Sequence, residues 1–114
     1  MPPRNWTLRV VDILDAIAAI QQFTAGMDFA TFTSDRKTLD AVLRNFTIIG
    51  EAARHVPDDV IVAYPEIPWQ DMRDMRNILM HEYFGVNLRI VWNTVQIYLP
   101  PLAPQLQRIL DEKH

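Results

Sequence analysis

The chain has no cysteine and only three glycines among its 114 residues. Without cysteine it can form neither disulfides nor thiolate zinc sites, and a reducing cytoplasm is the compartment that we expect. No apolar run reaches the roughly 18–20 residues that span a bilayer. The first residues, Met1 to Trp6, do not contain the apolar segment of a signal peptide. The sequence therefore predicts a cytoplasmic protein that is not anchored in a membrane.

The sequence also lacks the positive charge of a protein that coats nucleic acid, because its formal net charge is −3. Non-specific binding depends on lysine and arginine that neutralise phosphates, so any contact with RNA must be local or made by an assembly that gathers its arginines. No glycine-rich phosphate loop or G-x-S-x-G motif is present. The three histidines lack the H-x-x-x-H spacing of a metal site, and we expect neither a metal nor a cofactor.

Helical periodicity dominates a chain that is 49% hydrophobic, which is enough for the core of a single domain over residues 1–114. A first helix is predicted over 5–25 and is ended by Gly26, and a loop over 28–34 carries two phenylalanines. A second helix, capped by Ser34 or Asp35, should reach His55. Its predicted buried residues are Leu39, Val42, Phe46, Ile49 and Ala53.

The second half of the chain continues this pattern. A short helix is predicted over 58–64, and a longer one from Pro68 to Tyr83 or Phe84. A fifth helix, capped by Asn87, should kink or end at Pro100 and Pro101 before it resumes over 102–110. Trp69 and Trp92 are expected to pack beneath the fourth helix. The sequence thus predicts an all-α antiparallel bundle of about five helices.

The segment from Arg73 to Tyr83 carries the candidate chemistry. Arginine is a permanent cation suited to phosphate, and histidine can both accept and donate a proton near neutral pH. On a helix Arg73 neighbours Arg76 and Asn77, and Asn77 neighbours His81. Arg76 and His81 are about 140° apart around the helix axis, so they can flank one cleft.

Two interpretations of this segment remain open from its spacing. The neighbours of Arg76 on its own helix include no carboxylate, so an anion from elsewhere, such as a phosphate, would relieve its repulsion with Arg73. Alternatively, Arg76 pairs with a carboxylate of another helix, for which Glu51 and Asp15 are available. His81 would then be a hydrogen-bonded histidine near a helix end.

The run from Arg76 to His81 resembles the R-x4-6-H signature of the HEPN superfamily, small helical bundles that include many RNase toxins. Its extension to Tyr83 is similar to the R-x4-H-x-Y motif of the HepT family. Other segments with this similarity are Pro68-Trp69, Val91-Trp92 and Ile49-Gly50-Glu51-Ala52. The resemblance implies a HEPN-like fold and the toxin of a type VII-like toxin–antitoxin system.

The resemblance also implies roles for individual residues. The toxin would be a homodimer with one composite, metal-independent site that cleaves RNA, with transfer RNA among the candidate substrates. Arg76 would neutralise the scissile phosphate, and His81 would act as general acid and base. Asn77 would orient either the phosphate or the imidazole of His81. Arg73 is outside the minimal motif, and we expect it to contact RNA.

The implied partner is a minimal nucleotidyltransferase antitoxin (MntA-like) that silences the toxin by transferring AMP onto Tyr83. A modified phenol on the helix face of Arg76 would place an anion in the cleft meant for substrate phosphate. The alternative function is a non-catalytic module that binds the nucleotidyltransferase or a nucleotide through the same cleft.

Overall fold

The computed structural model describes residues 5–81 and 87–113, with the side chains of 78–81 excepted. All regular structure in these ranges is helical, so the predicted all-α class is confirmed. The elements are α1 (Trp6–Thr24), α2 (Phe29–Ser34), α3 (Arg36–Arg54), α4 (Asp58–Ala63), α5 (Trp69–His81), α6 (Leu88–Asn93), a π-helical turn η1 (Thr94–Tyr98) and α7 (Leu99–Glu112).

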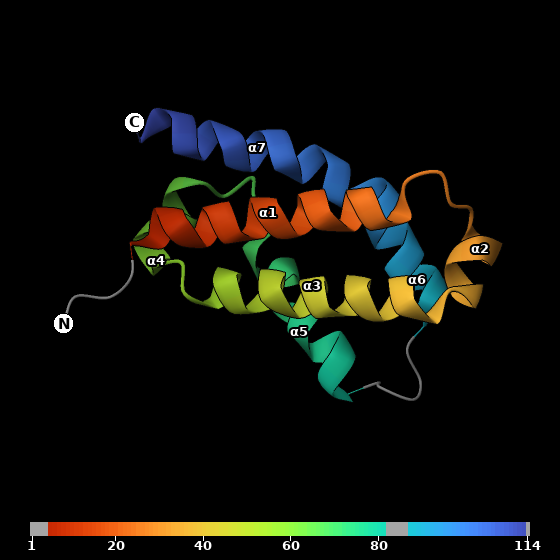
Figure 1. Ribbon diagram of the computed structural model, residues 1–114. Helices are drawn as coiled ribbons and strands as arrows, with labels where there is room; N and C mark the ends of the chain where they lie inside the picture. Colours follow the sequence, from red (N-terminus) through yellow and green to blue (C-terminus); the bar gives the residue numbers. More distant parts are fainter. Residues whose placement is uncertain (1–4, 82–86, 114) are drawn as a thin grey trace.

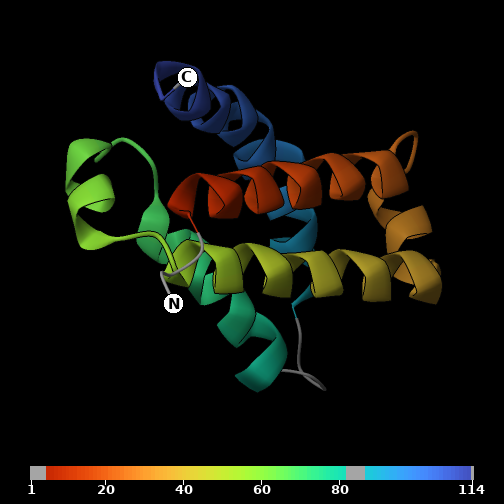
Figure 2. The same ribbon diagram turned by 60° about the vertical axis from the view of Figure 1, so that its left-hand side comes forward.

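The three longest helices lie side by side, with α1 between α3 and α7 (Figures 1 and 2). Both neighbours run antiparallel to α1, as predicted for an antiparallel bundle. The other main contact of α3 is with α5, which crosses it and extends past it in both views. This α3–α5 contact positions the candidate site.

The core lies where the apolar stripes of these helices meet. The apolar residues Val10, Ile13, Ile17 and Ile20 of α1 are buried. Most of the residues predicted to be buried in the second helix are also buried, while Leu39 is only partly buried. Each fully buried large aliphatic side chain stabilises the fold by about 1.5–3 kcal/mol. The central residues are Val10, Ile13, Ile17, Ile20, Val42, Phe46, Ile49, Ala53, Leu99, Leu102, Leu106 and Ile109.

The predicted ends of the first two long helices are close to the observed ones. Asn5 caps α1 through Oδ1, which accepts from the backbone N–H of Thr7 at 3.0 Å. Gly26 follows α1 with φ +76°, a conformation that suits glycine. Asp35, rather than Ser34, caps α3.

The prediction of a loop over 28–34 was wrong, because Phe29–Ser34 forms helix α2. The carboxylate of Asp28 accepts from the backbone N–H of Thr31 at 2.8 Å and caps it. Six residues are too few to show a helical period in sequence. Phe32 is fully buried and anchors this short helix to the core.

Trp92 packs on α2, so its predicted place beneath the fourth helix was also wrong. Its ring centroid lies 5.1 Å from that of Phe32 and 6.4 Å from that of Phe29. The guanidinium of Arg89 lies 3.6 Å from the centroid of the Phe29 ring, a cation–π contact. These contacts join α2 to α6. Trp69, in contrast, is buried at the start of α5.

The prediction was a kink or an end at the proline pair, and the structure instead has a π-helical turn, η1, just before the prolines. Asn87 caps α6 as predicted, and the chain then passes through η1 into α7 without a break. Pro100 and Pro101 lie in the first turn of α7, and because neither has an N–H, they cannot donate to the carbonyls of the preceding turn. The helix resumes at Leu99 rather than Leu102. Among the described helices, none is long and apolar enough to cross a bilayer.

Candidate active site

Gly50 lets α3 and α5 come into close contact at the position of the motif arginines. A Cβ atom at this buried position would lie 2.8 Å from both the Cβ and the backbone N of Arg76, and 3.1 Å from the carbonyl oxygen of Arg73. Such distances are too short for a side chain, so only glycine allows this spacing of the two backbones. The next residue, Glu51, is thereby brought within reach of Arg76.

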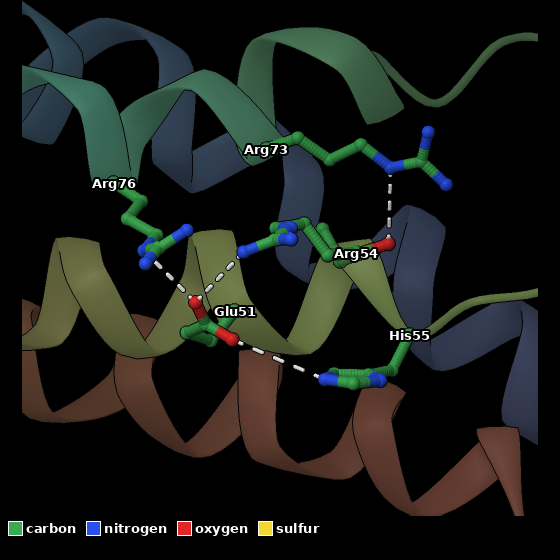
Figure 3. Close-up of polar contacts among 6 residues, drawn as sticks. Glu51, Arg54, His55, Arg73 and Arg76 are labelled. Atoms are coloured by element: carbon green, nitrogen blue, oxygen red, sulfur yellow. Dashed lines mark hydrogen bonds and ion pairs between the residues drawn. The ribbon is translucent and has the colours of Figure 1, made fainter.

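The carboxylate of Glu51 is the centre of a cluster of basic side chains (Figure 3). Its Oε1 forms an ion pair with Nε of Arg76 at 2.9 Å and accepts from Nη1 of Arg54 at 3.2 Å. The Nε2 of His55 lies 3.9 Å from the other oxygen, Oε2. The Arg76 and Glu51 side chains are 34% and 41% exposed, so solvent weakens this pair and an external anion can reach it.

This geometry confirms the second interpretation of Arg76, in which a carboxylate of another helix is its partner, and identifies Glu51 as that partner. Relief by an external phosphate is therefore not required for the fold. The ion pair uses Nε, at the inner edge of the guanidinium. Its terminal Nη1 and Nη2 groups carry further N–H donors, which can bind a phosphate as a fork.

Arg73 has a different environment from Arg76. Its Nε donates to the carbonyl oxygen of Ala53 at 3.2 Å and its Nη2 to that of Val56 at 3.4 Å. These carbonyls lie at and just beyond the carboxyl end of α3, where a positive charge is favourable. Arg73 thus caps α3 and ties it to α5. A contact between Arg73 and RNA stays a prediction.

A polar pocket of about 470 Å³ lies between the end of α3 and the face of α5. It brings together three of the four predicted site residues that precede Tyr83, namely Arg73, Arg76 and Asn77. Arg54 also lines it, although sequence reasoning did not select this residue. The feature of the sequence that could have indicated Arg54 is its position three residues after Glu51, on the same helix. The complete lining is Arg54, Asp58, Gln70, Arg73, Asp74, Arg76 and Asn77.

His81 is the last residue of α5, which places its backbone but not its side chain. The turns of α5 that lead to it extend past α3, away from the other helices (Figures 1 and 2). Tyr83 lies outside the described residues. Within the described ranges, no group of three histidine, aspartate or glutamate side chains could hold a metal ion.

Comparisons with known proteins identify the family. The model of the family described as ribonuclease HepT-like matches residues 13–109. The chain is 43% identical to the protein named Probable ribonuclease HepT of Thermococcus cleftensis over 98 residues, which are 86% of this chain and 89% of that protein. It is 37% identical over 112 residues to a Methanocaldococcus jannaschii protein provisionally named an RNase, covering 98% and 93%. No solved structure matches significantly. The chain belongs to the HepT-like ribonuclease family.

Proposed function

We propose that the protein is a metal-independent endoribonuclease in which Arg76 and His81 carry out the cleavage of RNA. The main structural support is the placement of Arg76. Glu51 holds it from its Nε side, and it lines a polar pocket with two further arginines. A guanidinium held in this way is ready to bind a phosphate without first being ordered, which favours stabilisation of the charge that develops in the transition state.

The proposed reaction is an internal transfer at phosphorus. One imidazole accepts the proton of the ribose 2′-OH, and the 2′-oxygen attacks the adjacent phosphorus. The bond from phosphorus to the 5′-oxygen breaks, and an acid donates a proton to that oxygen. The products are a 2′,3′-cyclic phosphate and a free 5′-OH. Arg76 would neutralise the non-bridging oxygens while negative charge builds on them.

The reaction needs both an acid and a base, and we propose that a homodimer supplies the second imidazole. His81 of one protomer would act as base and His81 of its partner as acid. The carboxyl end of α5 extends past α3, away from the other helices (Figure 2). Dimerisation would also concentrate arginines from two chains that each carry a net charge of −3.

The biological setting proposed here is a toxin–antitoxin pair in which a nucleotidyltransferase modifies Tyr83 with AMP. It is supported by the family and by the similarity of the run from Arg76 to Tyr83 to the R-x4-H-x-Y motif. Intact mass measurement after co-expression with the nucleotidyltransferase tests it. Increments of AMP that disappear in Tyr83→Phe would support the modification, and an unchanged mass would argue against it.

The direct test of the activity is RNA cleavage by the purified protein in excess EDTA. We expect the wild-type protein to cleave, and Arg76→Ala and His81→Ala to lose at least a hundredfold in rate, because each removes charge stabilisation or proton transfer. Circular dichroism checks that both variants are folded. Cleavage that persists in both folded variants would refute the assignment of these residues.

One observation favours a second candidate, a non-catalytic module that binds the nucleotidyltransferase or a nucleotide. The cation that should bind phosphate already has Glu51 as a partner at 2.9 Å. If this pair is permanent, the pocket would serve recognition and not catalysis. This candidate predicts that no RNA, including transfer RNA, is cut, while a stable complex with the nucleotidyltransferase forms.

A further inference from the structure

We propose that Arg54 of α3 binds a phosphate of the RNA next to the scissile one, so that the substrate site spans two helices. This inference rests on the proposed function, and it adds a residue that lies outside the motif. It gives the bound strand a path, from Arg76 along the polar pocket towards the carboxyl end of α3.

The first support is that Arg54 and Arg76 meet at one anionic oxygen. Oε1 of Glu51 lies 3.2 Å from Nη1 of Arg54 and 2.9 Å from Nε of Arg76. Two guanidinium groups from different helices are therefore both within hydrogen-bonding distance of a single point (Figure 3). Phosphate oxygens beside this point would lie within reach of both side chains, and arginine binds phosphate in this manner.

The second support is that Arg54 is free to exchange its partner. Its pair with Glu51 joins residues three apart on one helix, and its side chain is 51% exposed. Such exposed pairs are weak. Arg73, in contrast, uses Nε and Nη2 to bind two backbone carbonyls. Of these two arginines in the pocket, Arg54 can therefore turn towards a strand with less disturbance of the fold.

The third support concerns the helix end on which Arg54 lies. The last carbonyls of a helix carry partial negative charge and would repel a phosphate. Here the guanidinium of Arg73 binds the carbonyls of Ala53 and Val56 and offsets that charge. Two carboxylates, Asp58 and Asp74, also line the pocket. Their negative charge should repel the phosphates towards the arginines and weaken the binding of RNA. Neutralising Asp58 should therefore strengthen the binding of RNA.

The test compares Arg54→Gln with Arg36→Gln. Both remove one positive charge from α3. Arg36 also pairs with a carboxylate on its own helix, Asp40, at 3.2 Å. Arg36 is at the opposite end of α3, roughly 27 Å away along the helix axis. The probe is a short single-stranded RNA with 2′-O-methyl groups, which cannot form the cyclic product, and its affinity is measured over a range of salt concentrations.

We expect Arg54→Gln to weaken binding several-fold and to reduce the slope of log affinity against log salt by about 0.7, the value for one phosphate contact on a single strand. Arg36→Gln should leave the slope unchanged, Arg54→Lys should retain it, and Asp58→Asn should tighten binding. Equal losses in the two glutamine variants, or no loss in Arg54→Gln, would overturn the inference. Absence of cleavage by the wild-type protein would instead count against the proposed function, and the salt slope would still decide the role of Arg54.

Discussion

At position 51 a single carboxylate contacts basic side chains from two helices. Glu51 forms ion pairs with Arg76 of α5 and with Arg54 of its own helix α3, and His55 lies on its other side. An exposed ion pair of this kind contributes about 1 kcal/mol or less to stability. We infer that its main effect is on the position of Arg76 and not on the free energy of unfolding.

Glu51→Gln should therefore reduce cleavage more than stability. We expect the cleavage rate to fall roughly tenfold or more, because a small displacement of a catalytic side chain is costly. The thermal midpoint should change little. Asp40→Asn is the matched control, since it removes a carboxylate that pairs with Arg36 on the same helix. Wild-type cleavage rates in Glu51→Gln would contradict a positioning role for this residue.

Gly50→Ala tests the close contact beneath the site. Alanine favours a helix over glycine by up to about 1 kcal/mol, yet here its Cβ would lie 2.8 Å from Arg76 atoms. We expect a net loss of about 1–3 kcal/mol in urea unfolding, with reduced cleavage as Arg76 shifts. Gly26→Ala is the control, because a Cβ there meets nothing within 4 Å but φ is +76°. It should lose stability and retain activity, whereas a more stable and fully active Gly50→Ala would contradict the contact.

For individual residues, the sequence indicated which residues form the site but not which side chains they pair with. The spacing of Arg76 and Asn77 placed them on one helix, and both line the same pocket. Which carboxylate pairs with Arg76 depends on how α3 and α5 pack. The spacing between these helices is set by Gly50, whose role is visible only when its neighbours are known. Arg54 was missed because its place in the pocket beside Arg76 also depends on this packing.

The elements were predictable where a helical stripe was long enough to be recognised. The helices now defined as α1, α3 and α4 begin and end within a few residues of their predicted limits, and α5 begins within one residue of its predicted start. The predicted end of α5, at Tyr83 or Phe84, lies outside the described residues. The helix α2 was missed because six residues contain fewer than two turns. Its cap, Asp28, was a sequence signal of the same kind as Asp35, which was used for α3. Trp92 was misplaced because its aromatic partners belong to α2.

These two caps predict how stability depends on pH. The backbone N–H of Thr31 lowers the pKa of Asp28 below its usual 3.8, and that of Thr38 does the same for Asp35. Because both pKa values are lower in the folded state, this stabilisation is complete above about pH 4 and is lost as pH falls through the folded values. Replacing both aspartates with asparagine, which also caps helices, should flatten the pH dependence of the thermal midpoint below pH 4. An unchanged acid profile would contradict this source of stability.

The molecule as a whole is an acidic helical bundle of 42 × 28 × 25 Å whose candidate site lies at its surface. Three of its arginines, Arg54, Arg73 and Arg76, line one pocket, so local charge can attract RNA although the net charge of the chain is −3. Under the proposed mechanism, the site would be completed when two copies meet near the ends of α5.

This dimer predicts a concentration dependence of cleavage. Below the dissociation constant of the dimer, the rate per chain should fall as the protein is diluted, because each active site needs two protomers. Analytical ultracentrifugation over the same concentrations gives the fraction of dimer. A monomer that keeps the full rate per chain at every dilution would exclude a composite site.

The central claim, that this member of the HepT-like ribonuclease family cuts RNA by internal transfer without a metal, is tested most directly by the ends of the product. A single-stranded RNA is incubated with the wild-type protein in excess EDTA, and the fragments are identified by mass spectrometry. Attack by the ribose 2′-oxygen predicts fragments with a 2′,3′-cyclic phosphate and a free 5′-OH, which are absent with His81→Ala. Fragments with a 5′-phosphate, or cleavage that stops in EDTA, would contradict the mechanism.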